Sequence, residues 1–364
     1  MLIESTDDLP AERQRCFQLL RNHLEQVPGL ELRMFENQGY ESLVALPQGI
    51  VQPEILLCGH LDVVKHLMPG SYQSEIRGDR IYGAGAGDMK GQLAIMIELI
   101  RHLNQEQPGI SLGLAVTSDE ERGGEHGVKF LVEEIGLRCG LAIIPDGGSL
   151  VDVTEEEKGI IHLRLTSEGI SGHAARPWLG ENAIDRLVDS IAKVREHFAK
   201  FLPERICAED TGTHWFPTCT ATVLATDNES PNRIPDHARA VLDIRFVPPY
   251  TADTLLQEIR ALLATGVTAE PIVMAEPSHL APDPLYLEIT EAVLGVAPRL
   301  TKASGGSDGR FFAHAGIPVI LSRPTVGNLH GHDEWIDISS MLDYFEICRR
   351  HILARTNGGA EMRK

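Results

Sequence analysis

Three segments in the first third of the chain place metal-binding side chains after apolar runs or a glycine-rich turn. GHLDVV contains His60 and Asp62, GAGAGDMKG contains Asp88, and TSDEE contains Glu120 and Glu121. Imidazole nitrogens and carboxylate oxygens are ligands that divalent cations accept in mixed sites. A folded core gains nothing from a cluster of carboxylates unless cations neutralise it. The pattern therefore predicts a hydrolase that uses two metal ions.

Two further residues complete the candidate ligand set. Asp146 ends the apolar run LAIIP, and His330 lies in GNLHGHDEW. If Asp88 bridges the two ions, each ion receives one histidine, one carboxylate of its own and one shared oxygen. Three protein ligands leave a position open for water, as in catalytic zinc sites.

Three neighbouring side chains are expected to support the ligands. Residues i and i+2 of a strand share a face, so Asp62 can accept the second ring N–H of His60. Of the adjacent Glu120 and Glu121, one would bind metal and the other would act as general base. Cys58 is expected to be a small buried side chain rather than a thiolate ligand.

Composition excludes several classes of partner. The 364 residues are 43% apolar and 23% charged, and their formal net charge is −19. Nucleic acids and anionic membranes require a basic face, so neither is an expected partner. The N-terminus MLIESTDDLPAERQR lacks a signal-peptide pattern, and no run reaches the ~20 apolar residues of a membrane span. Six cysteines without a CxxC pair predict reduced thiols and a cytoplasmic location, with a Cys207–Cys219 disulfide as the alternative.

Alternating strands and helices predict an α/β catalytic domain, formed by residues 1–160 and 277–364, around a mainly parallel sheet covered on both faces. Ligands of such sheets bind beyond the carboxyl ends of the strands, where the candidate residues lie. Asp283 and Pro284 are the expected start of a helix. The predicted helices span 8–26, 91–103, 127–135 and 339–354, and the predicted strands span 54–58, 110–117, 141–145 and 317–321.

Residues 161–276 have a different pattern, which predicts an inserted ferredoxin-like α+β domain. The order of elements is β-α-β-β-α-β. The predicted strands span 161–167, 219–226, 237–246 and 270–276, and the predicted helices span 182–201 and 251–264.

Two other site chemistries fit the sequence less well. The run GAGAG has the wrong spacing for a dinucleotide fingerprint, and the Asp88 that follows would repel a pyrophosphate. Gly305, Ser307 and Gly309 match the G-x-S-x-G pattern of serine hydrolases, with His330 or His332 as partner. No strong strand directly precedes Ser307, which disfavours this alternative.

The motifs together resemble those of the di-zinc acylase and carboxypeptidase family. This family contains acetylornithine deacetylase, succinyl-diaminopimelate desuccinylase and glutamate carboxypeptidases. The resemblance covers nearly the whole chain, in the order GHLDVV, GAGAGDMKG, TSDEE, GISGHAARP, GGSDGRFF and NLHGHDEW. It implies one zinc held by His60, Asp146 and bridging Asp88, and a second held by Asp88, Glu121 and His330.

The resemblance also implies roles around the metals. Asp62 would orient the ligand histidine, and Glu120 would be the general acid and base. His173 would reach from the inserted domain, a lid and dimerisation domain in the family, into a partner subunit's site and stabilise the oxyanion. Asn232 and Arg310 match positions that bind the carboxylate of the substrate.

The sequence departs from the family pattern in two places. His332 stands where the family has a proline, so it is an alternative ligand to His330, which we favour for its offset of three residues from Asp333. The loop between Val64 and Arg80 lacks the usual tryptophan and has Tyr72 nearby.

The expected enzyme is a homodimeric amidohydrolase acting on an N-acyl-amino acid, of the deacetylase or desuccinylase kind. A metal-bridging water would lose its proton to Glu120 and attack the amide carbonyl. Zinc is the expected metal, with cobalt and manganese as alternatives. Cleavage of short peptides by a carboxypeptidase or dipeptidase is the alternative function, and a non-catalytic binding scaffold is a further one.

Overall fold

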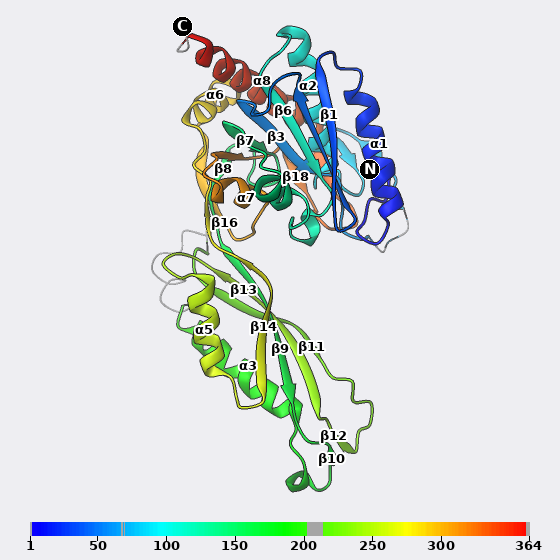
Figure 1. The fold of residues 1–364 in the computed structure, drawn as a ribbon, viewed down its shortest axis with the longest axis vertical. Coiled ribbons are helices and arrows are strands. Elements are labelled where there is room, and N and C mark those ends of the chain that lie inside the picture. The colour runs from blue at the N-terminus through cyan, green and yellow to red at the C-terminus, as the bar shows by residue number, and fades with distance from the viewer. Residues whose placement is uncertain (1, 67, 69, 202–213, 362–364) are drawn as a thin grey trace. The chain divides into compact units, whose positions relative to one another are not determined.

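The computed structural model describes residues 2–66, 68, 70–201 and 214–361. The chain divides into two compact units (Figure 1). Unit 1 consists of Met1–Glu155, His279–Ala303 and Ser307–Lys364, and unit 2 of Glu156–Ser278 and Ser304–Gly306. Unit 2 is therefore almost entirely an insertion in the sequence of unit 1.

Unit 1 is built on a nine-stranded sheet in which β1-β2-β6-β3-β7-β17-β8-β15 are neighbours and β16 pairs with β8. The central pairs β6/β3, β3/β7 and β7/β17 are parallel, whereas β1/β2, β2/β6 and β17/β8 are antiparallel. The α/β prediction is confirmed, but the sheet is mixed rather than mainly parallel. The strands are β1 (Leu30–Asn37), β2 (Tyr40–Pro47), β3 (Ile55–His60), β6 (Leu112–Thr117), β7 (Leu141–Ile144), β8 (Asp152–Glu157), β15 (Ser278–His279), β16 (Arg299–Ala303) and β17 (Val319–Leu321).

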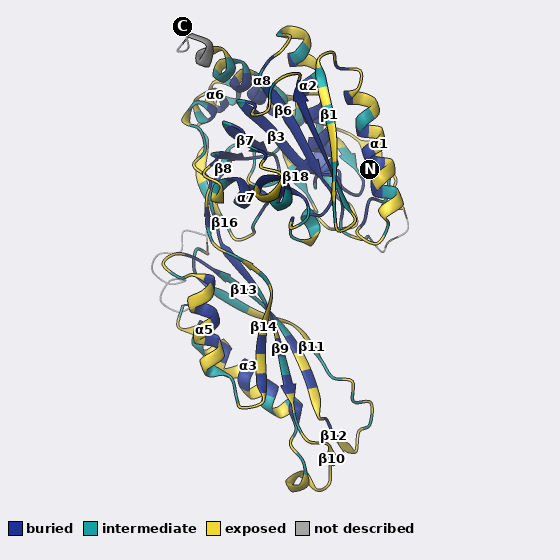
Figure 2. Ribbon diagram, in the orientation of Figure 1, coloured by how far each residue is buried: buried dark blue, intermediate teal, exposed yellow. Residues whose placement is uncertain are grey.

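Both faces of the central strands β3, β6 and β7 are buried, which explains their unbroken apolar runs (Figure 2). Ile55 and Leu57 of β3 join one core with α1, α2, α6 and α8. Leu56 and Cys58 point to the opposite face and join a second core with η2 and α7. The helical elements are α1 (Pro10–Leu24), α2 (Lys90–Glu106), η1 (Glu120–Arg122), the π-helical η2 (Phe130–Glu134), α6 (Pro284–Leu294), α7 (Gly309–His314) and α8 (Ile338–Glu361).

A second, four-stranded sheet of unit 1 lies in the order β18-β19-β5-β4. This sheet joins the strand just before the glycine-rich turn to the segment that carries GHDEW, since Tyr82 pairs with Trp335. Its strands are β4 (Glu75–Arg77), β5 (Arg80–Tyr82), β18 (Val326–Gly327) and β19 (Trp335–Asp337).

Unit 2 has a four-stranded antiparallel sheet in the order β11-β13-β9-β14. Alternate residues of β13, such as Leu242 and Ile244, are buried in a core with α3 and α5. A small ladder, β10 with β12, lies outside this sheet. The elements are β9 (Gly159–Glu168), β10 (Gly172–His173), η3 (Pro177–Leu179), α3 (Ala183–Ala199), β11 (Thr218–Ala225), β12 (Arg233–Ile234), β13 (His237–Phe246), α5 (Ala252–Leu262) and β14 (Val267–Ala275).

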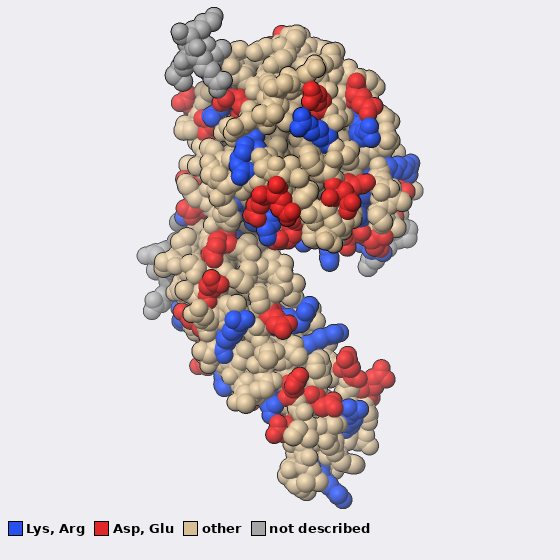
Figure 3. Space-filling view, in the orientation of Figure 1, with Lys and Arg blue, Asp and Glu red and all other residues tan. Residues whose placement is uncertain are grey.

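Surface charge and thiols agree with the composition. On the face shown in Figure 3, lysine and arginine side chains are interspersed with acidic ones. The five described cysteines are free, and Cys207 lies outside the described residues. None of the helices among the described residues combines the length and apolarity that a membrane span requires.

Asp283 does more than start α6. Its Oδ1 accepts from Leu285 N at 3.0 Å, and its Oδ2 contacts His351 Nε2 at 3.0 Å and Arg355 Nη1 at 2.5 Å. His351 and Arg355 belong to α8, so this one carboxylate joins two helices of the larger core. The hydrogen bond with His351 is the largest cause that holds the pKa of Asp283 far below its usual range.

We expect Asp283→Asn to lower the free energy of unfolding by about 2 to 4 kcal/mol at pH 7, because the Arg355 guanidinium and the buried His351 ring lose an anionic partner. Since the folded pKa is depressed, this contribution is present above pH ~4 and is lost as pH falls further. Urea unfolding at pH 7 and pH 3 measures both effects. Asp343→Asn, at an exposed acid of α8, is the control; an equal effect of the two substitutions at pH 7 would contradict the assignment.

Candidate metal centre

The predicted ligands lie at the carboxyl edge of the parallel strands. His60 is the last residue of β3 and is paired with Thr117, the last residue of β6. Glu121 follows β6 within η1, and Asp146 lies two residues beyond β7. Parallel strands end at the same edge of a sheet, so segments far apart in sequence deliver their polar side chains to one place.

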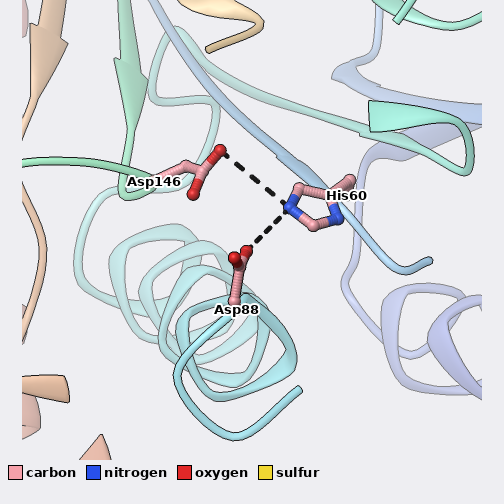
Figure 4. A group of neighbouring side chains, drawn as sticks. All are labelled: His60, Asp88 and Asp146. Atoms are coloured by element: carbon pink, nitrogen blue, oxygen red, sulfur yellow. Dashed lines mark hydrogen bonds and ion pairs between the residues drawn. The ribbon is translucent and has the colours of Figure 1, made fainter. Parts of the chain in front are cut away.

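One group of ligand atoms comes from His60, Asp88 and Asp146 (Figure 4). His60 Nε2 lies 3.1 Å from Asp88 Oδ1 and 4.0 Å from Asp146 Oδ2. One nitrogen and two carboxylate oxygens within 4.8 Å of one another form a donor set suited to a divalent cation.

The second group shares Asp88 with the first and adds Glu121 and His330. His330 Nε2 lies 3.1 Å from Asp88 Oδ2 and 3.4 Å from Glu121 Oε1. The two oxygens of Asp88 thus face two different histidines. The exposed His332 belongs to neither group, so the structure places His330 where the ligand was expected.

The charges of these residues fit cations. Although burial lowers it, hydrogen bonds with Asp62 and Asp88 raise the pKa of His60 well above its ordinary value. Hydrogen bonds with Asp88 and Glu121 raise the pKa of His330 to about 10. Burial, and then the charge of Asp88, raise the pKa of Asp146 well above its ordinary value. The carboxylates therefore favour positive charge at both groups.

Asp62 joins the two groups through the backbone. His60 Nδ1 is 3.0 Å from the carbonyl oxygen of Asp62 and 3.4 Å from its carboxylate Oδ1. The other carboxylate oxygen, Oδ2, accepts from the backbone N–H of Glu121 at 3.0 Å. Asp62 thus orients the imidazole ring of His60, which belongs to the first group, and the backbone of Glu121, which belongs to the second.

Glu120 stands next to Glu121 in η1, and its carboxyl group is suited to carrying a proton. Burial, followed by the charge of Asp146, raises the pKa of Glu120 well above its ordinary value. Cations bound nearby would lower this pKa again, because positive charge favours the carboxylate form. A buried carboxyl group whose pKa burial raises can hold a proton and release it again, as general acid–base catalysis requires.

Glu334 holds the turn that carries Asp88, and sequence reasoning assigned it no role. The side chain is buried, and its two oxygens accept from the backbone N–H groups of Gly85 at 3.0 Å, Gly87 at 2.7 Å and Asp88 at 2.8 Å. Gly85 has φ of +74°, and a Cβ there would lie 2.7 Å from Val63 Cγ1. The turn therefore needs Gly85 and this carboxylate, and the position of Glu334 within GHDEW was the only signal in the sequence.

Three other residues that the sequence analysis singled out, Cys58, Ser307 and Arg310, are all buried. Cys58 is fully buried, and burial raises the pKa of its thiol well above the ordinary value, as a small core side chain requires. Ser307 is buried, and its hydroxyl accepts from Gly309 N at 3.1 Å, which does not suit an exposed nucleophile. Arg310 is 7% exposed and donates from Nη2 to the carbonyl of Gly123 at 2.6 Å.

His173 and Asn232 belong to unit 2, where the structure brings them together. Both are exposed, on β10 and just before β12 respectively, and Ala174 N donates to the carbonyl of Asn232 at 2.8 Å. The ring atom Nδ1 of His173 accepts from Ala175 N at 3.1 Å. Arg323, which the sequence did not single out, lies 3.9 Å from Asp146 Oδ1 in unit 1.

Comparison with known proteins places this geometry in context. The family model described as Peptidase family M20/M25/M40 matches residues 56–354. The chain is 29% identical to a succinyl-diaminopimelate desuccinylase of Erythrobacter litoralis over 324 residues, which are 83% of this chain and 81% of that protein. It is 28% identical to the desuccinylase of Novosphingobium aromaticivorans, over 86% of this chain and 85% of that one.

Solved structures share the fold at low identity. An M20 family metallo-carboxypeptidase from Sulfolobus solfataricus has a TM-score of 0.78 and 18% identity, covering 98% of this chain and 97% of that one. A tripeptidase from Staphylococcus aureus has a TM-score of 0.77 and 18% identity, with coverage of 98% and 96%. At this identity the likeness speaks for the fold alone.

We expect Glu334→Gln to weaken metal binding by roughly 10- to 100-fold, because loss of the charge and of one acceptor loosens the turn that aims Asp88. Competition with a chromophoric zinc chelator measures the affinity. Glu98→Gln, at an exposed acid paired with Arg101, is the control. Unchanged affinity in a folded Glu334 variant would show that the turn holds Asp88 without Glu334.

Proposed function

Since the chain belongs to peptidase family M20/M25/M40, and is thus a hydrolase of amide bonds, we propose that it cleaves the amide of an N-acyl-amino acid. The family match agrees with the resemblance that the motifs predicted. The observation that carries the proposal is the Asp88 carboxylate, whose two oxygens face two histidines, each with a further carboxylate beside it.

Two divalent cations, which the family implies, are the proposed cofactors. His60, Asp146 and Asp88 would hold one cation, and Asp88, Glu121 and His330 the other. When bound, the cations would polarise the amide carbonyl and make water more acidic. Zinc remains the predicted metal, with cobalt and manganese as alternatives.

Glu120 is the proposed carrier of the proton. It would accept a proton from the attacking water and donate it to the leaving nitrogen, so that an amine departs instead of an amide anion. The pKa of Glu120, which burial raises, supports the second of these steps. Asp62 would act through others, since its contacts fix the ring of His60 and the backbone of Glu121.

Substrate binding and assembly are proposed from the family resemblance. His173 would stabilise the oxyanion from a partner subunit, with unit 2 as lid and dimerisation domain of a homodimer. Asn232 and Arg310 would bind the carboxylate of the amino acid. Arg310 has five N–H donors, so the bond of Nη2 to Gly123 leaves others for a substrate. The cytoplasmic location stays a prediction that rests on the free thiols.

The name of the similar desuccinylases supports an N-acyl-amino acid as the substrate. A dipeptidase or carboxypeptidase would use the same metal centre and differ in the acyl part of its substrate. A panel of N-acetyl-amino acids, N-succinyl-amino acids and dipeptides therefore separates the two. We expect turnover of N-acyl-amino acids that a chelator abolishes and zinc restores; turnover of dipeptides alone would favour the peptidase.

We expect Glu120→Gln to lower kcat by roughly 10²- to 10⁴-fold while both metals stay bound, because the amide side chain carries no proton between water and nitrogen. Single-substrate kinetics and metal analysis of the same sample measure the two quantities. Glu125→Gln, at an exposed acid of the same loop, should stay within about twofold of the parent protein. Near-normal turnover of a fully metallated Glu120 variant would contradict the assigned role.

A further inference from the structure

A short segment before the first helix, residues 3–8, lies beside the chain that leaves β3. Its residue Asp8 pairs with Lys65 at 2.5 Å, and its residue Ser5 is fully buried. A hydroxyl group buried that completely needs hydrogen-bonding partners. The partners of Ser5 lie on either side of Asp62, the residue that contacts members of both groups of metal ligands.

Ser5 bonds to the two peptide groups that flank Asp62. Its hydroxyl donates to the carbonyl of Leu61 at 2.6 Å, and its own carbonyl accepts from the N–H of Val63 at 3.2 Å. The carbonyl of Leu61 belongs to the peptide group before Asp62, and the N–H of Val63 belongs to the one after it. Because peptide groups are planar, holding both of them holds the two backbone dihedrals of Asp62.

The peptide group after Asp62 also carries the oxygen that faces the ring of His60. The carbonyl oxygen of Asp62 lies 3.0 Å from His60 Nδ1, and a carbonyl can only accept a hydrogen bond. In the neutral ring this contact keeps the hydrogen on Nδ1, so that Nε2, which lies 3.1 Å from Asp88 Oδ1, is free to bind a cation. Ser5 therefore acts on this ligand atom through a single peptide group.

The side chain of Asp62 depends on the same backbone. Its Oδ2 accepts from the N–H of Glu121 at 3.0 Å, and its Oδ1 lies 3.4 Å from His60 Nδ1. Both contacts require the Cα–Cβ bond of Asp62 to keep its direction, which the two flanking peptide groups set. The influence of Ser5 thus extends to the backbone of a ligand in the second group.

The segment 3–8 is also bonded to the helix that follows Asp88. Lys90, in the first turn of α2, is buried and donates from Nζ to the carbonyl of Ile3 at 2.7 Å. The segment therefore has hydrogen bonds both to the chain after His60 and to the chain after Asp88. These two stretches of chain each deliver a ligand to the centre.

We propose that Ser5 is a positioning residue of the metal centre, which orients His60 and Asp62 through the two peptide groups beside Asp62. The proposal rests on the proposed function, since it needs cations at this centre, and extends it to the segment before the first helix. Ser5 lies outside residues 56–354, the part of the chain that matches the family model. Its role therefore follows from the geometry alone.

The first test measures zinc affinity by competition with a chromophoric chelator. Ser5→Ala removes the hydroxyl but keeps the carbonyl that accepts from Val63. We expect it to weaken zinc binding by about tenfold, as loss of a group that orients a ligand does. Ser190→Ala is the control, because it removes an equally buried hydroxyl, which donates to the carbonyl of Arg186 at 3.0 Å in unit 2. The control should leave the zinc affinity unchanged.

Two readouts separate positioning from a loss of stability. At saturating zinc, Ser5→Ala should lower kcat by about 3- to 10-fold, with KM within about twofold of the parent value. In cobalt-loaded protein, the visible absorption reports the geometry of the ligands. This absorption should differ between Ser5→Ala and the parent protein but not between Ser190→Ala and the parent. Urea unfolding measures the stability that each variant has lost.

Hydrogen exchange tests the contact without metal or turnover. In the metal-free protein, the amides of residues 61–63 should exchange faster in Ser5→Ala than in the parent, because the peptide groups beside Asp62 lose one of the two bonds to Ser5. Ser190→Ala should leave the exchange of these amides unchanged.

Parent-like zinc affinity and cobalt absorption in a folded Ser5→Ala protein would overturn the proposal. So would an equal loss of zinc affinity in Ser190→Ala, or a Ser5→Ala protein that fails to fold, since Ser5 would then be a residue of the fold rather than of the centre. If the parent protein cleaves no N-acyl-amino acid, the proposed function fails, and the zinc affinity, the cobalt absorption and the hydrogen exchange still decide the role of Ser5.

Discussion

The metal centre depends on one carboxylate that is shared between two groups of ligands. Each oxygen of Asp88 lies 3.1 Å from a different histidine, so the two groups keep a fixed separation. Asp88 follows a turn of glycines whose backbone N–H groups bond to Glu334, and its other side is joined to the first turn of α2. A displacement of this turn would alter both groups at once, which is why a buried acid 246 positions away in the sequence matters to the site.

The sheet supplies the rest of the arrangement. Its central strands are parallel and buried on both faces, so their polar residues come only at the carboxyl ends, where His60, Glu121 and Asp146 lie. Asp62 then couples the end of β3 to the turn after β6 by accepting from the N–H of Glu121. The site is acidic because it is built for cations, and burial makes each carboxylate favour a positive neighbour.

Sequence patterns predicted the strands, the helix start and the ligand residues that depend on short-range periodicity or on residue chemistry. Unbroken apolar runs identified β3, β6 and β7, and Asp283 was recognised as a helix N-cap. The set of five candidate ligands also came from residue type and position, and the structure brings those five together. The strands β1 and β2 were missed. The residues of β1 are exposed or half-buried and none is fully buried, whereas β2 has the buried apolar run 43–46, which the sequence analysis did not use. The mixed character of the sheet and the role of Glu334 depend on contacts between distant segments, which periodicity does not report.

The central claim is that two cations share Asp88, and anomalous diffraction from crystals of the zinc-loaded protein tests it most directly. The account predicts two zinc peaks in unit 1, ~3.5 to 4 Å apart. One should lie beside His60 and Asp146 and the other beside Glu121 and His330, with an oxygen of Asp88 at each. A single peak, or a second peak that Asp88 does not contact, would contradict the shared carboxylate and with it the proposed division of the ligands.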